Sequence, residues 1–299
     1  MQVAWKVEAG SNVKLQDYDP DYVDEHTDPA LARAELEQLG KELGELQELL
    51  AAAHHHSLLV VLQGMDTSGK ADTIHQVLSR VNPQGCEVRS FKVPTSREVD
   101  HDFLWRVHRV TPGRGVMGIF NRSHYEDVLV VRVHNLVPQE AWNRRYAAIN
   151  DFERLLAQND MIILKLYLHM SHDEQERRLL AQQKNQADAW KVTTADWAER
   201  KYWDDYQEAY EAALSRCSTD EAPWYIVPAN QKWYRNLLVA RTLVSTLRQY
   251  KDEWEAQLVA RGERELLLLA QLGHLGRLGQ TGNGENKRSK KAQKANGAT

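Results

Sequence analysis

The stretch LLVVLQGMDTSGK, residues 58–70, decides the fold of this chain. Its apolar run, Leu58–Gln63, leads into the pattern G-x-x-x-x-G-K, and residues with helical periodicity follow from Thr73 to Val81. A strand, a glycine loop and a helix in this order are the setting in which the pattern forms a phosphate-binding loop. A strand–loop–helix unit with incidental glycines is the alternative interpretation of the motif alone.

The loop contains the groups that an anion site needs. Gly64 and Gly69 permit turns closed to other residues and let backbone N–H groups approach an anion. The N-terminus of the next helix adds partial positive charge, and Lys70 supplies a mobile full charge. We therefore predict that phosphate is bound by the loop residues Gly64, Thr67, Ser68, Gly69 and Lys70.

Ala71 occupies the position where the standard loop has a serine or threonine whose hydroxyl binds magnesium. The loop contains Asp66 instead. A carboxylate beside phosphates is favourable when a divalent cation lies between them. We therefore predict that Asp66 is a ligand of magnesium (or manganese), directly or through water.

The composition of the 299-residue chain suits one large α/β domain or a domain with an inserted subdomain, because it is 42% hydrophobic and 27% charged. A net charge of −4 argues against general nucleic-acid binding, so any polyanion must meet a local basic patch. Two cysteines, Cys86 and Cys217, are too few for a disulfide framework or a zinc site. The N-terminus MQVAWKVEAG has no apolar signal core, and no segment has the length of a membrane span. We expect a cytoplasmic protein without membrane association.

The order of elements predicts an α/β fold. Polar residues up to Asp28 are expected to form a surface arm, followed by a helix over 31–50 with His54–His56 at its solvated end. Helical patterns then alternate with five apolar runs: Leu58–Gln63, Glu87–Phe91, Val116–Phe120, Met161–Leu168 and Trp224–Val227. This alternation predicts a P-loop kinase-like (thymidylate-kinase-like) three-layer sandwich with a parallel five-stranded sheet. Ligands of such folds lie beyond the carboxyl ends of the strands.

A charged helical hairpin interrupts the core before the last strand. Ser171–Glu174 and Thr193–Asp196 are typical of helix caps, and the hairpin between about 171 and 216 is predicted to be a lid over the substrate. A solvated helix pair is the plainer alternative. A long helix is expected over Lys232–Leu269. We divide the chain into an N-terminal arm and helix (1–56), a core with the lid (57–270) and a polar, basic tail that we expect to be disordered (271–299).

Polar residues follow the third strand run. Arg122 lies at its carboxyl end, where it can reach phosphates bound by the glycine loop, and its neighbour Asn121 can ligate or hydrogen-bond without adding charge. Glu126 follows four residues later, on the same face if a helix begins here. A structural Arg122–Glu126 salt bridge and a catalytic role for either residue are both open.

Basic residues from other segments are predicted to converge on the same cleft. Lys92 and Pro94 follow the second strand run on the ligand side, and Arg106 lies in the next helical segment. Together with Lys70, Arg122 and the lid arginines, they would give an acidic protein a basic groove that attracts a phosphate chain.

Several long phrases of the sequence resemble the polyphosphate kinase 2 family: GMDTSGK (64–70), VNPQGCEVRSFKVP (81–94), DHDFLWR (100–106), GIFNRSHYEDVLVVRVH (118–134) and APWYIVPANQKWYRNLLVAR (222–241). The resemblance extends from Lys14 to about Arg248. It implies magnesium-dependent transfer of the terminal phosphoryl group of inorganic polyphosphate to a nucleotide. Asn121, in place of an aspartate, resembles the class III branch, whose members accept both AMP and ADP.

The resemblance also implies roles for individual residues. Asp66 and Glu126 would orient the metal and the acceptor, while Lys70 and Arg122 would bind phosphates around the transferred group. These four form the predicted catalytic set. The nucleotide pocket would contain Lys92, Pro94, Arg106, Asn121 and Asp127, and polyphosphate would be held from the lid by Arg177 and Arg178.

Three departures from the family pattern are present: Ala71-Asp72 replaces Asp-Gly, His75 replaces a basic residue, and Gln182–Ala189 replaces a more basic lid stretch. The last predicts that polyphosphate binding is weaker, or depends differently on salt, than in relatives. Alternatives to a polyphosphate-dependent nucleotide kinase are an ATP-dependent nucleoside monophosphate kinase and a weakly active polyphosphate- or nucleotide-binding regulator. The expected partners are a nucleotide, polyphosphate and further copies of the chain in a homo-oligomer (dimer or tetramer), with no nucleic acid.

Overall fold

A mixed sheet forms the centre of the protein. The computed structural model describes residues 3–185 and 193–293, with side chains to residue 272. The strands of the sheet are β1 (Trp5–Val7), β2 (Ser57–Gly64), β3 (Cys86–Ser90), β4 (Met117–Asn121), β5 (Met161–His169) and β6 (Trp224–Pro228). Their order is β1-β6-β5-β2-β4-β3, and β2 to β6 are parallel throughout.

The two central strands are the most apolar ones. Every residue of β2 and of β5 is buried, because helices cover both faces of the sheet. The predicted parallel sheet is therefore confirmed, but the predicted number of five strands was wrong. The sixth strand, β1, pairs antiparallel with β6, with Trp5 opposite Ile226. Three residues of alternating burial inside a polar arm are too short a pattern to indicate a strand.

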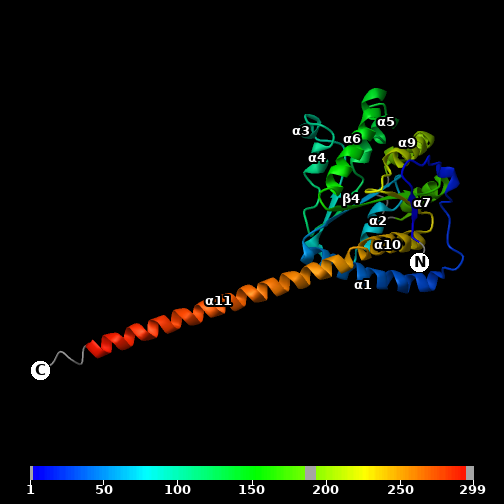
Figure 1. The fold of residues 1–299 in the computed structure, drawn as a ribbon. Coiled ribbons are helices and arrows are strands. Elements are labelled where there is room, and N and C mark those ends of the chain that lie inside the picture. Colours follow the sequence, from blue (N-terminus) through cyan, green and yellow to red (C-terminus); the bar gives the residue numbers. More distant parts are fainter. Residues whose placement is uncertain (1–2, 186–192, 294–299) are drawn as a thin grey trace. The chain divides into compact units, whose positions relative to one another are not determined.

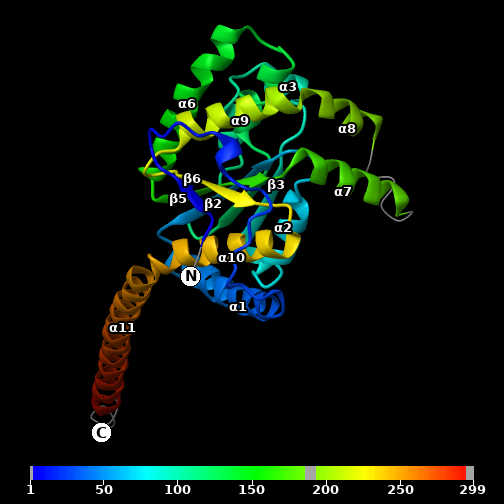
Figure 2. The ribbon, with the colours of Figure 1, turned by 90° about the vertical axis from the view of Figure 1, so that its right-hand side faces the viewer.

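Helices form a layer on each face of the sheet (Figures 1 and 2). One layer contains α1 (Pro29–Ala53), α2 (Lys70–Val77) and α10 (Lys232–Arg248). The other contains α5 (Val130–Val133), α6 (Gln139–Ala157) and α9 (Trp203–Cys217). The side chain of Asp28 accepts a hydrogen bond from the Ala30 N–H at 2.7 Å and thereby caps the N-terminus of α1. This arrangement is the expected three-layer sandwich.

The predicted helical hairpin is also present. It consists of α7 (His172–Lys184), α8 (Thr194–Glu199), a 3₁₀ turn (Arg200–Tyr202) and α9, and we call this segment the lid. The hydroxyl of Ser171 caps α7, and Thr193 with Asp196 forms a reciprocal capping box on α8. Residues 186–189 of the altered lid stretch lie outside the described residues.

Short elements complete the core. They are α3 (Ser96–Val99), α4 (Trp105–His108) and the 3₁₀ helices η1 (Leu15–Asp17), η2 (Pro83–Gly85) and η3 (His124–Asp127). The most important of these for the site is η3, because it begins two residues after Arg122.

The C-terminal part differs from the prediction in two ways. The single helix expected over Lys232–Leu269 is divided, since α10 ends at Arg248 and α11 spans Lys251–Gln293. The tail from residue 271, expected to be disordered, is helical to Gln293. No proline follows Pro228 in the sequence, and the glycines that suggested disorder weaken a helix by about 1 kcal/mol each without breaking it. By contacts, residues 252–299 form a compact unit separate from residues 1–251.

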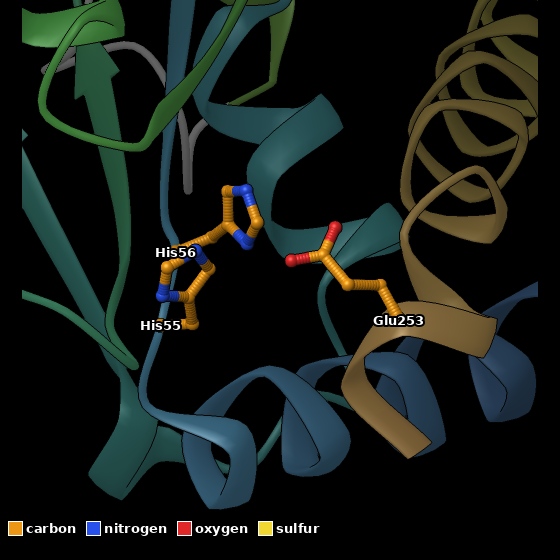
Figure 3. Close-up of side chains that lie close together, drawn as sticks. All are labelled: His55, His56 and Glu253. Carbon is orange, nitrogen blue, oxygen red and sulfur yellow. The ribbon is translucent and has the colours of Figure 1, made fainter. Parts of the chain in front are cut away.

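The three consecutive histidines follow the end of α1. His54 is exposed, in agreement with its predicted place at a solvated helix end. It ends α1 in the left-handed conformation, with φ 54°, which is common at helix C-termini. His55 and His56 are half-buried and lie edge to face, with ring centroids 4.6 Å apart (Figure 3). No helix among residues 3–185 and 193–293 is long and apolar enough to cross a lipid bilayer.

Candidate active site

A cavity of about 640 Å³ lies where the glycine loop, the end of β4, the lid and the start of α10 meet. It is lined by Asp66, Thr67, Gly69, Lys70, Ala71, Asp72, Asn121, Arg122, Arg178, Ala181, Gln182, Asn185, Lys232 and Arg235. We call it the loop cavity. It occupies the carboxyl ends of β2 and β4, the edge at which parallel sheets bind ligands.

The backbone of the glycine loop has the conformation that its sequence predicts. Gly64 and Gly69 have φ values of 152° and 100°, and Thr67 joins them in the left-handed region at 65°. A Cβ atom on Gly69 would lie 1.8 Å from a guanidinium nitrogen of Arg235, so a side chain at this position would displace that guanidinium and would also strain the backbone. The buried hydroxyls of Thr67 and Ser68 make no hydrogen bond within the described part of the chain. Of the predicted phosphate-binding residues, Thr67, Gly69 and Lys70 line the loop cavity, whereas Gly64 and Ser68 lie outside its lining.

Lys70 is buried at the start of α2 and turns back onto the loop. Its Nζ donates hydrogen bonds to the carbonyl oxygens of Gly64 at 2.7 Å and Met65 at 3.1 Å. Burial lowers the pKa of Lys70 to about 8, against the opposing effect of the Asp66 carboxylate. An anion in the loop cavity would supply the charge partner that this ammonium group needs.

Arg122 joins the two predicted catalytic carboxylates. Its guanidinium donates to Glu126 at 3.3 Å and, at short range, to Asp66. Burial acts to lower the pKa of Arg122, but the two carboxylates outweigh it and raise this pKa. The salt bridge to Glu126, which the spacing left as an alternative, is present. Asp66 is a second partner that the spacing did not indicate.

Asp66 and Glu126 converge on one point from different elements. They provide hard oxygen ligands, and the guanidinium between them shows that this point attracts positive charge. Asn121, at the end of β4, lines the loop cavity together with Asp66, whereas Glu126 lies outside this lining. This donor set fits a magnesium ion.

A second cavity of about 550 Å³ lies on the other side of Arg122. We call it the acceptor cavity. It is lined by Phe91, Lys92, Val93, Pro94, Arg106, Arg122, Glu126, Asp127, Val130, Val131 and Leu136. Four of the five residues predicted to form the nucleotide pocket meet here. The fifth, Asn121, lies in the loop cavity instead.

Asp127 is buried beneath the acceptor cavity and is held by two arginines. Arg106 contacts one oxygen of its carboxylate at 3.4 Å, and Arg145 donates to the other at 3.0 Å. Burial raises the pKa of Asp127, while these arginines act to lower it. Arg145 was not predicted, because it comes from α6 and contacts Asp127 only in the folded chain.

The two lid arginines have different surroundings. Arg178 is buried, and its five donor groups point to Glu174 and to the carbonyl oxygens of Thr67, Ser68, Ala229 and Asn230. It fastens α7 to the glycine loop and to the end of β6. Arg177 is 73% exposed at its side chain, pairs with Glu174 and lies outside both cavity linings. The predicted contact of either arginine with polyphosphate stays a prediction.

Two basic residues of α10 were missed. Lys232 and Arg235 line the loop cavity, and the completely buried Arg235 donates to the Ser68 carbonyl at 3.0 Å and to Asp72 at short range. The position of their segment directly after the last strand could have indicated them, since the carboxyl ends of parallel strands share one edge. Asp72, noted as a departure from the family pattern, is thus an ion-pair partner of Arg235.

Comparison with known proteins identifies the family. The family model of polyphosphate kinase 2 matches residues 26–255. An AMP/ADP-polyphosphate phosphotransferase of Meiothermus ruber is 50% identical over 244 residues, which are 81% of this chain and 91% of that protein. An ADP-polyphosphate phosphotransferase of Rhodopseudomonas palustris is 42% identical over 265 residues, covering 85% and 90% of the two chains. The crystal structure of a polyphosphate kinase 2 from Arthrobacter aurescens superposes with a TM-score of 0.80 at 40% identity, over 84% of this chain and 92% of that one. The chain therefore belongs to the polyphosphate kinase 2 family.

Proposed function

We propose that this protein is an enzyme that transfers the terminal phosphoryl group of inorganic polyphosphate to AMP, to ADP or to both. One observation carries the proposal: two cavities, one lined by the glycine loop and one by the predicted nucleotide residues, meet at Arg122. A donor phosphate chain and an acceptor nucleotide would then face each other across this guanidinium. The names of the relatives from Meiothermus ruber and Rhodopseudomonas palustris support the same chemistry.

The transfer requires one bond to form and one to break. A phosphate oxygen of the nucleotide attacks the terminal phosphorus, and the bridging oxygen of the next phosphate leaves with the electron pair. The protein contributes position and positive charge, which is what phosphoryl transfer needs most. Lys70 and the N–H groups of the glycine loop would bind the donor, and Arg122 would neutralise charge on the transferred group.

Asp66 and Glu126 would hold a magnesium or manganese ion, which supplies charge neutralisation for the donor oxygens when bound. We expect Asp66→Asn to raise the magnesium concentration needed for half-maximal turnover by about tenfold or more, since one charged ligand is lost. Asp72→Asn is the matched control, because this carboxylate lines the same cavity but pairs with Arg235. Equal metal requirements in both variants would contradict the assignment.

The donor assay separates the proposal from its main alternative. The protein is incubated with polyphosphate and either AMP or ADP, without ATP, and the products are separated by chromatography. Formation of ADP or ATP supports the proposal. Turnover of AMP with ATP alone would indicate an ordinary nucleoside monophosphate kinase.

The Lys70→Ala variant tests the third interpretation, a binding protein with little catalysis. We expect this variant to lose turnover by at least about a hundredfold, because it removes the full charge of the glycine loop. Nucleotide binding without turnover in the unaltered protein would favour a regulator. A homo-oligomeric state and a cytoplasmic location belong to the same proposal; sedimentation and cell fractionation test them.

A further inference from the structure

A buried polar cluster includes two residues of η3, the 3₁₀ helix that follows Arg122. Lys165 of β5 donates hydrogen bonds to Glu153 of α6 at 2.5 Å, to the Tyr125 hydroxyl at 2.8 Å and to the Cys217 carbonyl at 2.5 Å. Glu153 also accepts from Tyr125 at 2.9 Å and contacts His124 at 3.1 Å. All four side chains are at most 1% exposed. We call these four residues the Lys165 cluster.

The cluster connects the parts that the transfer step must hold in register. His124 and Tyr125 belong to η3, the turn between Arg122 and Asp127, and Cys217 is the last residue of α9 in the lid. Lys165 thus bonds both the turn and the base of the lid to the central strand. A lysine suits the second role, since the carbonyl groups at a helix end carry partial negative charge.

The backbone conformation of Arg122 explains why the neighbouring residues of η3 must be held in place by the Lys165 cluster. Its φ of 62° lies in the left-handed region, which disfavours side chains other than glycine by about 1–3 kcal/mol. Such a conformation persists only when its surroundings fix it. The Arg122 N–H donates to the Leu62 carbonyl at 3.0 Å, and the next residues are fixed by Ser123 and by the cluster.

The Lys165 cluster contains an ion pair between Lys165 and Glu153. Burial acts to raise the pKa of Glu153, but Lys165 and the hydrogen bond from His124 outweigh it, so that this pKa is lowered and the carboxylate stays ionised. A buried ion pair contributes little net stability, because desolvation offsets the attraction. The ion pair instead orients its neighbours, since each donor and acceptor fixes the position of one neighbouring element.

We propose that Lys165 and Glu153 are positioning residues for phosphoryl transfer: through Tyr125 and His124 they hold Arg122 and Glu126 in their reactive places, and through the Cys217 carbonyl they hold the base of the lid. This inference rests on the proposed function. It adds that the rate of the chemical step depends on groups that touch no substrate.

The mildest test is Tyr125→Phe, which removes one hydroxyl from the cluster and keeps its volume. We expect kcat to fall about tenfold, equivalent to about 1.4 kcal/mol, while KM for nucleotide and polyphosphate changes less than about twofold. Tyr146→Phe is the matched control, because Tyr146 is a buried tyrosine of the same helix as Glu153 and takes no part in the cluster through its hydroxyl. It should leave both constants unchanged.

Hydrogen exchange provides a readout that does not depend on turnover. In Tyr125→Phe, amides of residues 121–128 and 214–218 should exchange faster than in the unaltered protein and in Tyr146→Phe. A fall in melting temperature with unchanged kcat and unchanged exchange would show a merely structural cluster and overturn the inference. Faster exchange at residues 121–128 in a protein that never shows polyphosphate-dependent turnover would uphold the anchor and reject the proposed function.

The ion pair itself is tested by single and double replacements. Lys165→Met and Glu153→Met each leave a buried charge unpaired, whereas the double variant removes both charges. We expect the double variant to regain thermal stability but not kcat, because the directed contacts to Tyr125 and Cys217 remain lost. Recovery of kcat together with stability would contradict a positioning role.

Discussion

Arg122 combines a strained backbone with a side chain shared by two carboxylates. Its guanidinium is also the wall common to the loop cavity and the acceptor cavity. A planar group with several donors can contact Asp66, Glu126 and a phosphate oxygen together, whereas an ammonium group contacts them as a point charge.

We expect Arg122→Lys to lower kcat by about a hundredfold, because one donor group cannot reproduce the contacts on both sides. KM for the nucleotide should change much less, since Lys92, Arg106 and Asp127 remain in the acceptor cavity. Steady-state kinetics with each substrate varied in turn measures both constants. An unchanged kcat would show that charge alone is needed at this position.

Lys70 predicts a pH dependence of donor binding. Burial lowers its pKa to about 8 in the empty protein, so the loop loses its full positive charge as pH rises through 8. The value of kcat/KM for polyphosphate should therefore fall above about pH 8, up to tenfold per unit. Stability has the opposite sign: between pH 8 and 10.5 the folded state binds fewer protons than the unfolded chain, so this group makes the free energy of unfolding rise with pH. A flat profile of kcat/KM from pH 7 to 9.5 would contradict this prediction.

At the scale of elements, two residues in the described part of the altered lid stretch line the proposed donor site. Gln182 and Asn185 line the loop cavity opposite the glycine loop, while Gln183, the next residue of α7, is exposed outside its lining. The resemblance described in the sequence analysis implies more positive charge in this stretch of the family. Its absence here removes attraction at a place where a phosphate chain would lie.

We expect Gln182→Arg to lower the apparent Kd for polyphosphate about three- to tenfold at low salt, with a smaller effect at high salt because the added attraction is screened. Gln183→Arg adds the same charge one residue away, outside the cavity lining, and should have a smaller effect. Binding isotherms at several salt concentrations measure the difference. Equal gains from the two variants would indicate a general charge effect instead of a contact in the cavity.

The sequence predicted the parallel strands well, because four of the five are short apolar runs; β3 is the exception, with Glu87 and Arg89 among its exposed residues. It left the Arg122–Glu126 salt bridge as an open alternative and did not indicate the contact between Arg122 and Asp66, although their loops follow neighbouring strands. Arg235 and Arg145 were missed for a different reason. They act through buried contacts with residues 18 to 167 positions away, which no local spacing shows.

At the scale of the whole molecule, the two compact units have different surfaces. Residues 1–251 expose large apolar side chains only at scattered positions, whereas α11 exposes Leu266, Leu267, Leu268, Leu269 and Leu272 close together, each by 46% or more. Four consecutive leucines point to all sides of a helix. Such an exposed apolar segment is typical of an interface, which agrees with the proposed homo-oligomer.

We expect the double change Leu266→Gln and Leu269→Gln to lower the mass observed by sedimentation velocity at micromolar concentration, because each leucine buried in an interface contributes about 1.5–3 kcal/mol. Leu31→Gln in α1 is the matched control, since this leucine is also 69% exposed but stands alone. An unchanged mass in the double variant would place the association elsewhere or show that the protein is a monomer.

The pairing of the edge strand β1 with β6 determines when the sheet can be completed during synthesis. Its partner β6 begins 217 residues after the end of β1, at Trp224 against Val7. A ribosome adds roughly 5–20 residues per second, so β1 waits for roughly ten to forty seconds before its partner exists. During that interval the nascent chain carries an unpaired strand beside a growing apolar sheet. Synthesis speed and chaperone supply should therefore affect the yield of folded protein.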